Sequence, residues 1–284
     1  MALNNFSQRA LFGAVYVGLL TGATLAGGWW FFFLCLLLVA LCLYELYSLS
    51  LPGRGKGFRV VLLLLALPHF AVQALSELVY LEQTSFPGSA LLQQFLLFWE
   101  HNLGRISYLF VLLITLFSAK RDDLLWNTGV FALSLFYIVW PLGELAKWPE
   151  TLVMYVFVLT WSSDTFAYLG GKALGRHKLY EPVSPGKTWE GFFSGLLGTI
   201  LVAWVYVHFR EMDNLFIYLV APAVHVAGTL GDLTESLMKR NIGVKDSGNI
   251  IPGHGGILDR LDAMLFIIPV VALLLHLFEI PYQP

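Results

Sequence analysis

The chain has 284 residues, of which 57% are hydrophobic and only 13% are charged. Apolar stretches of roughly 17 to 25 residues, the length that crosses a bilayer, recur along the whole sequence. This pattern excludes an ordinary soluble protein of one or two domains, and the net charge of −2 gives no reason to expect a nucleic-acid partner. The composition predicts an all-α integral membrane protein.

Nine spans can be placed in chain order, which predicts a polytopic bundle of about nine transmembrane helices. They cover residues 10–26, 29–49, 60–80, 106–119, 124–145, 151–170, 189–209, 215–238 and 261–279. The fourth span is short and is the weakest of the nine, and for the semi-polar segment before it, residues 86–102, a location in the membrane interface is the alternative.

The positive residues predict the orientation of this bundle. Fourteen of the 17 lysine and arginine residues fall on one side of the layout, and only Arg105, Lys147 and Arg210 fall on the other. Because cytoplasmic loops carry the excess of positive residues, the N-terminus is predicted to be cytoplasmic.

Two carboxylates lie inside predicted spans at similar depths. Asp164 follows Ser163 in the sixth span, and Asp232 lies on a polar stripe of the eighth span that also carries His225. Ionisable groups within a membrane are costly and therefore candidates for function. We expect both carboxylates to line a cavity open to the cytoplasm, with a structural hydrogen bond between helices as the alternative for Asp164. His225 can equally form a hydrogen bond between helices, and the isolated Glu45 is interpreted as structural.

The charge of the chain is concentrated between Ser236 and Asp262. This stretch contains Lys239, Arg240, Lys245, Asp246, His254, Asp259, Arg260 and Asp262. Asp259 and Asp262 share one face at the start of the last predicted helix, and Asp232 comes from the helix before it, so three carboxylates can converge. Clusters of oxygen ligands suit Mg²⁺.

A glycine-rich turn, Pro-Gly-His-Gly-Gly, ends at Gly255 and Gly256 directly before the last helix. Its backbone amides and the positive end of the helix dipole suit a phosphate group. The lysine and arginine residues of the stretch supply further contacts to anions. Carboxylates for a metal and cations for phosphate in one loop indicate a phosphoryl- or nucleotidyl-transfer site.

A second loop, residues 172–188, carries Ser184, Lys187 and Thr188 before the seventh predicted helix. This cluster also suits phosphate, and the alternative is a helix cap with positive residues on the cytoplasmic side. A P-loop is excluded for two reasons. Glu181 stands where the first glycine is required, and the loop joins two predicted membrane helices instead of following a strand.

The motif from Ser236 to Asp262 resembles the signature of the phosphatidate cytidylyltransferase (CDP-diacylglycerol synthase) family. It reads Ser-x-Met-Lys-Arg-x4-Lys-Asp-x-Gly-x2-Ile-Pro-x-His-Gly-Gly-Ile-x-Asp-Arg-Leu-Asp. Ser163-Asp164, the segment 231–236 and the segment 184–191 are similar to other elements of that family. The resemblance covers residues 161–262, whereas the first 150 residues are similar only in being a hydrophobic bundle.

The resemblance implies a membrane enzyme, commonly dimeric, that joins CTP and phosphatidate to give CDP-diacylglycerol and pyrophosphate with Mg²⁺. It implies metal ligation by Asp232, Asp259 and Asp262, with a monovalent cation such as K⁺ nearby. It also implies contacts to phosphate or nucleotide from Lys239, Arg240, Lys245, His254 and Arg260. A bacterial inner-membrane protein with its active site facing the cytoplasm is expected.

On this basis residues 1–150 form an N-terminal region of about five spans, and residues 151–284 form the catalytic region. The phosphatidate headgroup is expected to attack the α-phosphorus of CTP in line, with Asp246 and His254 as positioning groups. Other CTP-using lipid enzymes, such as a CDP-archaeol synthase or a polyprenol kinase, are the nearest alternatives. A transporter that uses Asp164, Asp232 and His225 as an ion path is the alternative from another class.

Overall fold

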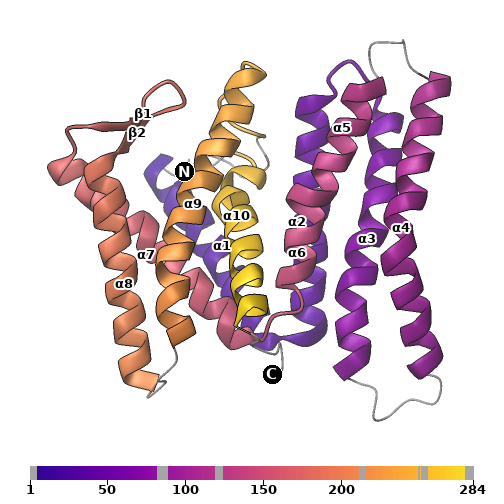
Figure 1. The fold of residues 1–284 in the computed structure, drawn as a ribbon. Helices are drawn as coiled ribbons and strands as arrows, with labels where there is room; N and C mark the ends of the chain where they lie inside the picture. The colour runs from indigo at the N-terminus through magenta and orange to yellow at the C-terminus, as the bar shows by residue number, and fades with distance from the viewer. Residues whose placement is uncertain are drawn as a thin grey trace. The chain divides into compact units, whose positions relative to one another are not determined.

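The computed structural model describes residues 5–81, 89–118, 124–210, 215–248, 250 and 255–278. Nearly all of these residues are helical (Figure 1), which confirms the predicted all-α fold. The chain divides into two compact units. The first comprises Met1–Trp148 and Ser247–Leu258, and the second comprises Pro149–Asp246 and Asp259–Pro284.

Seven helices in the described part of the chain are long and apolar enough to cross a membrane, and Gly13–Ala26 is a shorter apolar helix. Large apolar side chains such as Leu197, Trp204 and Leu273 are exposed on these helices, as expected where a helix faces lipid. The protein is therefore a multi-pass membrane protein. The total of about nine spans and the cytoplasmic N-terminus stay predictions.

The described part of the first unit is built mainly from helices that follow one another in sequence. They are α1 (Asn5–Ala26), α2 (Gly28–Ser50), α3 (Lys56–Leu81), α4 (Ser89–Ser118), α5 (Leu124–Ser134) and α6 (Trp140–Leu145). Helix α3 packs against α2, α4 and α6. Its Leu62 and Phe70 are fully buried, as is Leu43 of α2, so these apolar side chains form the core of this unit.

Two predicted spans of the first unit have features that the sequence did not indicate. Helix α4 is one continuous helix of 30 residues, so the described part of residues 86–102 is not a separate element. The fifth span keeps its predicted extent, but α5 continues through a π-helical turn, Leu135–Val139, into α6. Pro141 follows that turn, and because proline has no N–H group the regular helical hydrogen bonding is interrupted there.

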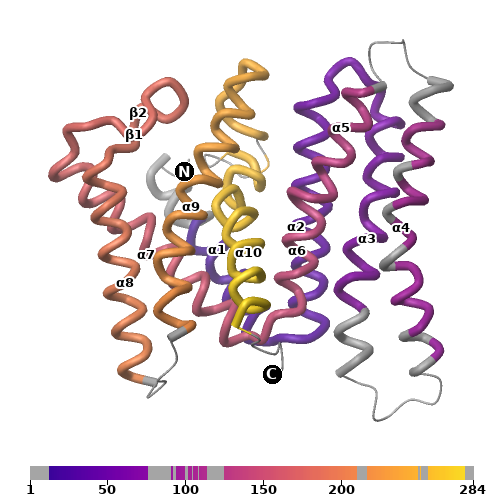
Figure 2. The backbone as a smooth tube through the Cα atoms, in the orientation of Figure 1, coloured from indigo at the N-terminus to yellow at the C-terminus, as the bar shows by residue number. Residues whose placement is uncertain are grey.

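The second unit carries most of the predicted site residues. Its elements are α7 (Glu150–Leu174), β1 (Lys178–Tyr180), β2 (Ser184–Thr188), α8 (Trp189–Arg210), α9 (Leu215–Asn241) and, from Asp259 onward, α10 (Leu258–Leu277). Helix α8 packs against both α7 and α9, and Figure 2 traces the chain from α7 through the strands into α8. The hydroxyl group of Tyr155 in α7 donates to the carbonyl oxygen of Ile217 in α9 over 2.8 Å.

The segment between α7 and α8 is a β-hairpin, whereas the sequence predicted a loop. Strands β1 and β2 are antiparallel, with Lys178 opposite Thr188. Glu190, in the first turn of α8, accepts hydrogen bonds from the backbone N–H groups of Arg176 (3.0 Å) and His177 (3.2 Å). Its other carboxylate oxygen lies 2.6 Å from Nδ1 of His177. The hairpin is thus closed at its base by the helix that follows it.

Candidate active site

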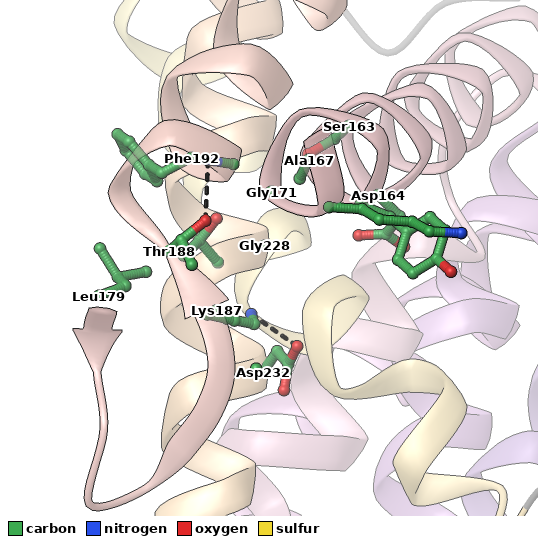
Figure 3. A pocket seen from close by; sticks show the side chains of 15 residues that line it. Ser163, Asp164, Ala167, Gly171, Leu179, Lys187, Thr188, Phe192, Gly228 and Asp232 are labelled. Carbon is green, nitrogen blue, oxygen red and sulfur yellow. Dashed lines mark hydrogen bonds and ion pairs between the residues drawn. The ribbon is translucent and has the colours of Figure 1, made fainter. Parts of the chain in front are cut away.

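An open pocket of about 370 Å³ in the second unit brings together residues from α7, the hairpin, α8 and α9 (Figure 3). Five predicted site residues line it: Ser163, Asp164, Lys187, Thr188 and Asp232. Ser163 and Asp232, the two that lie furthest apart in sequence, are separated by 69 positions. The expectation that Asp164 and Asp232 line one cavity is therefore met by the geometry.

Lys187 and Asp232 form the central ion pair of this pocket. Nζ of Lys187 lies 2.6 Å from Oδ2 of Asp232, and both side chains are partly exposed (Figure 3). Asp164 is close enough to be attracted by Lys187 and repelled by Asp232. A single ammonium group thus stands near two carboxylates, which is the charge arrangement in which an anionic ligand can compete for the lysine.

Thr188 combines two features that the sequence had offered as alternatives. Its Oγ1 accepts a hydrogen bond from the backbone N–H of Gly191 over 3.1 Å, which is the geometry of a helix cap at the start of α8. The same side chain lines the pocket (Figure 3). The positive end of the α8 dipole is therefore directed to the region of Lys187 and Thr188.

A contact between Ser163, which lines the pocket, and His225 connects α7 to α9. Oγ of Ser163 lies 2.8 Å from Nδ1 of His225, whose side chain is buried. The imidazole ring also contacts the ring of Phe192, with centroids 4.6 Å apart. Nε2 of His225 has no hydrogen-bond partner among the residues that the structure describes. This is the hydrogen bond between helices that the sequence left open as a role for His225.

A second charged cluster joins the last turn of α9 to the first turn of α10. Nζ of Lys239 lies 2.6 Å from Oδ1 of Asp259 and also forms an ion pair with Glu235, one turn earlier in α9. The side chain of Glu235 is only 1% exposed. No role was predicted for Glu235 from the sequence. Its position four residues before Lys239 is the signal that could have revealed the pair.

Asp262 lies close to Asp232 because α9 and α10 approach each other at Gly231. A Cβ atom at Gly231 would lie 2.5 Å from the carbonyl oxygen of Asp262, so only glycine fits. The carboxylates of Asp232 and Asp262 repel each other, and Lys187 and Lys239 both attract Asp262. Oδ1 of Asp262 accepts the backbone N–H of Ala263 over 2.7 Å.

These carboxylates fit Mg²⁺ by donor chemistry, since they offer only hard oxygen ligands. Asp232 and Asp259 are each paired with a lysine ammonium group, which supplies the positive charge at these oxygens. As the side chains stand, no group of three or more His, Cys, Asp or Glu residues in the described ranges is arranged to hold a metal ion. The ligand set Asp232, Asp259 and Asp262 stays a prediction.

The remaining predicted residues differ in their exposure. Nη1 of Arg240 donates to the carbonyl oxygen of Val244 over 3.0 Å. Arg240, Lys245, Asp246 and Arg260 are exposed, Ser184 and Gly255 are partly buried, and Gly256 is buried. His254 lies outside the residues that the structure describes. Exposed cations around a carboxylate centre are suited to bind phosphate groups that arrive from the aqueous side.

Comparisons with known proteins found a matching family and similar relatives. Residues 7–278 match the model of the family described as the cytidylyltransferase family. A phosphatidate cytidylyltransferase of Staphylococcus epidermidis is 47% identical over 125 residues, which are 43% of this chain and 48% of the relative. One of Bacillus subtilis is 42% identical over 146 residues, which are 51% of this chain and 54% of the relative. In these matches the chain spans about half the length of the curated relatives.

Proposed function

Because the chain belongs to the cytidylyltransferase family, we propose that it joins CTP and phosphatidate to give CDP-diacylglycerol and pyrophosphate. The observation that carries this proposal is the pocket in which Lys187 is paired with Asp232 at the start of α8. The names of the relatives from Staphylococcus epidermidis and Bacillus subtilis support the choice of phosphatidate as the acceptor.

The reaction forms a bond between an oxygen of the phosphatidate phosphate and the α-phosphorus of CTP. The bond from the α-phosphorus to the oxygen that bridges to the β-phosphorus breaks, and pyrophosphate leaves with the electron pair. A phosphate monoester is already a nucleophile at neutral pH, so the chain does not need a strong general base. Asp246 and His254 are therefore assigned as positioning groups.

The two substrates are both anions, and their mutual repulsion opposes the reaction until it is neutralised. We assign this task to Lys187 and Lys239. In support, the ammonium group of each lies 2.6 Å from a carboxylate oxygen, of Asp232 and Asp259 respectively. Substrate phosphates can take the place of these carboxylates as partners of the lysines. The positive end of α8 at Thr188 adds a fixed dipole on the same side of the pocket.

Mg²⁺ belongs to this proposal as the resident cation. Asp232, Asp259 and Asp262 would hold it, and the bound ion would neutralise charge on the CTP phosphates. With these carboxylates holding the ion, Lys187 and Lys239 would be available to contact the phosphate groups of the substrates. A monovalent cation such as K⁺, implied by the resemblance, would bind nearby in addition to Mg²⁺.

The acceptor is a lipid, so the site must be reachable from the bilayer. Apolar Ala167, Leu179 and Phe192 line the pocket beside its charged groups. The neighbouring Leu169 and Phe193 are exposed. We assign the acyl chains of phosphatidate to this apolar side and its headgroup to Lys187.

The cellular setting follows from the charge distribution and from the relatives. The lysine and arginine residues of both charged clusters fall on the side of the layout that is rich in positive charge, so the site is proposed to face the cytoplasm. The relatives come from bacteria, which supports a bacterial inner-membrane location. A homodimer is proposed on the resemblance alone.

Incubating the purified protein in lipid–detergent micelles with CTP, phosphatidate and Mg²⁺ tests the proposal. We expect pyrophosphate and a CDP-linked lipid in equal amounts, and neither product when CTP or phosphatidate is omitted. Asp232→Asn is the matched negative control, because it removes the carboxylate of the central ion pair and keeps the side-chain size. A wild-type protein that forms neither product would overturn the enzyme proposal and leave the transporter alternative.

A further inference from the structure

Glu45 of α2 is a buried carboxylate that, among the described residues, accepts hydrogen bonds from residues near the other end of the sequence. Glu45 is only 2% exposed. The backbone N–H of Ile257 donates to Oε1 over 3.0 Å, and that of Leu258 donates to Oε2 over 2.8 Å. Oγ of Ser247 donates to Oε2 over 3.1 Å. One side chain thus holds both ends of the segment Ser247–Leu258.

The two backbone donors have a particular place in the fold. Leu258 is the first residue of α10, and the first N–H groups of a helix have no partner within the helix. A side chain close by in sequence usually accepts these hydrogen bonds. Here Glu45 accepts them from 213 residues away, and its negative charge lies at the positive end of α10. The start of α10 is therefore fixed by α2.

The segment is also shaped to leave room for this carboxylate. A Cβ atom at either Gly248 or Gly256 would lie 2.6 Å from Oε1 of Glu45. A larger residue at these positions would force the carboxylate or the segment to move. Both glycines belong to the signature stretch, so part of that stretch is accounted for by its fit around Glu45.

We propose that Glu45 is a positioning residue that sets where α10 begins and thereby places Asp259 and Asp262. Asp259 directly follows Leu258, and Asp262 follows one helical turn later on the same face. Asp259 accepts Lys239, and Asp262 lies near Asp232. This inference rests on the proposed function, and it gives the N-terminal helices a role in catalysis through α2.

Glu45→Gln tests this role with little change in side-chain volume. The amide can accept hydrogen bonds at one oxygen only, and its NH₂ group would face an N–H donor. We expect faster hydrogen–deuterium exchange in a peptide that covers residues 257–262 of the purified protein. We also expect kcat to fall by about 10- to 100-fold, as is typical when a residue that orients metal ligands is changed. The Mg²⁺ concentration for half-maximal rate should rise, whereas a loss of folded protein alone would leave it unchanged.

Glu144→Gln is the matched control, since Glu144 is another buried glutamate of the first unit. Its partners include Nε2 of Gln73 at 3.4 Å and Nζ of Lys147 at 3.5 Å, two residues that lie outside the Ser247–Leu258 segment. Exchange of residues 257–262 and the Mg²⁺ requirement should match those of the wild type. An equal effect of both substitutions would overturn the positioning role.

Ser247→Ala keeps the inference testable if Glu45→Gln does not fold. It removes the hydrogen bond from the serine hydroxyl group and leaves those of Ile257 and Leu258, so we expect a smaller change in the same direction, about threefold in kcat. Unchanged exchange and unchanged kcat in Ser247→Ala would count against the inference, as would faster exchange in Glu45→Gln at wild-type kcat and Mg²⁺ requirement. If the wild type makes no CDP-linked lipid, the proposed function fails, while the exchange data still decide whether Glu45 fixes the start of α10.

Discussion

Nζ of Lys239 lies 2.6 Å from Oδ1 of Asp259, which joins the last turn of α9 to the first turn of α10. The lysine lies at the negative end of one helix dipole and the aspartate at the positive end of another, so both charges are favoured by their helices. Lys239 also pairs with the buried Glu235, and the side chains of the three residues are between 1% and 12% exposed. The carboxylates of Glu235 and Asp259 therefore share the ammonium group of Lys239 as their cation.

Removing the lysine of this cluster should destabilise the protein. Lys239→Gln leaves Glu235 and Asp259 without their shared cation, and breaking a buried pair from one side typically costs about 3 kcal/mol. We expect a lower thermal unfolding midpoint in detergent. The double variant Glu235→Gln, Lys239→Gln should recover part of that loss without recovering activity. A single variant as stable as the wild type would show that the pair contributes nothing to folding.

Lys187 should matter for the reaction more than for stability, because its side chain is 27% exposed in an open pocket. Without its ammonium group the negative charge of CTP and phosphatidate is less well neutralised, so kcat/KM should fall by about 100-fold in Lys187→Ala. Steady-state rates at varied CTP measure this effect. Lys56→Ala, at an exposed lysine of α3, is the control and should keep the wild-type value. Equal rates for the two variants would remove Lys187 from the site.

The close approach at Gly231 predicts that even one methyl group is harmful there. Gly231→Ala would place a Cβ atom 2.5 Å from the carbonyl oxygen of Asp262, and overpacking of this kind typically costs about 1 to 3 kcal/mol. We expect a lower unfolding midpoint and a lower kcat, because Asp232 and Asp262 are moved apart. Gly18→Ala in α1 meets nothing within 4 Å and should be neutral or slightly stabilising. Equal unfolding midpoints and equal kcat values in the two alanine variants would contradict this prediction.

Metal removal tests the proposed ligand set. Turnover should be lost when divalent ions are chelated and should return when Mg²⁺ is added in excess, because Asp232, Asp259 and Asp262 offer oxygen ligands only. Asp259→Asn should abolish turnover while the folded protein remains abundant, as judged by its elution from a size-exclusion column. Full activity in the presence of the chelator, or near-normal activity of Asp259→Asn, would contradict the metal site.

The general fold and one pocket could be predicted from the sequence because both depend on local patterns. Runs of apolar residues of membrane length identify helices whatever their neighbours are. Asp164 and Asp232 were placed at similar depths by counting along two helices, and both line the pocket. The hairpin was missed because its strands have only three and five residues, and Pro185 and Gly186 in the second strand do not follow a strand pattern.

Glu45 shows what a sequence of this kind cannot reveal. On its own helix it has apolar neighbours, so it was interpreted as structural. Its partners Ser247, Ile257 and Leu258 lie more than 200 residues away, and two of them act through backbone N–H groups that carry no side-chain signal. Only the folded chain brings these donors to the carboxylate. Glu235 was missed for a related reason, because its burial depends on how α9 packs.

The position of the transferred phosphorus tests the central claim most directly. CTP labelled at the α-phosphorus and CTP labelled at the γ-phosphorus are each incubated with the protein, phosphatidate and Mg²⁺, and the lipid is extracted. If the chain is a cytidylyltransferase acting on phosphatidate, the α-label enters the lipid and the γ-label is recovered entirely in pyrophosphate. Entry of the γ-label into lipid would indicate a kinase, and absence of both labels from the lipid would contradict lipid-directed transfer from CTP.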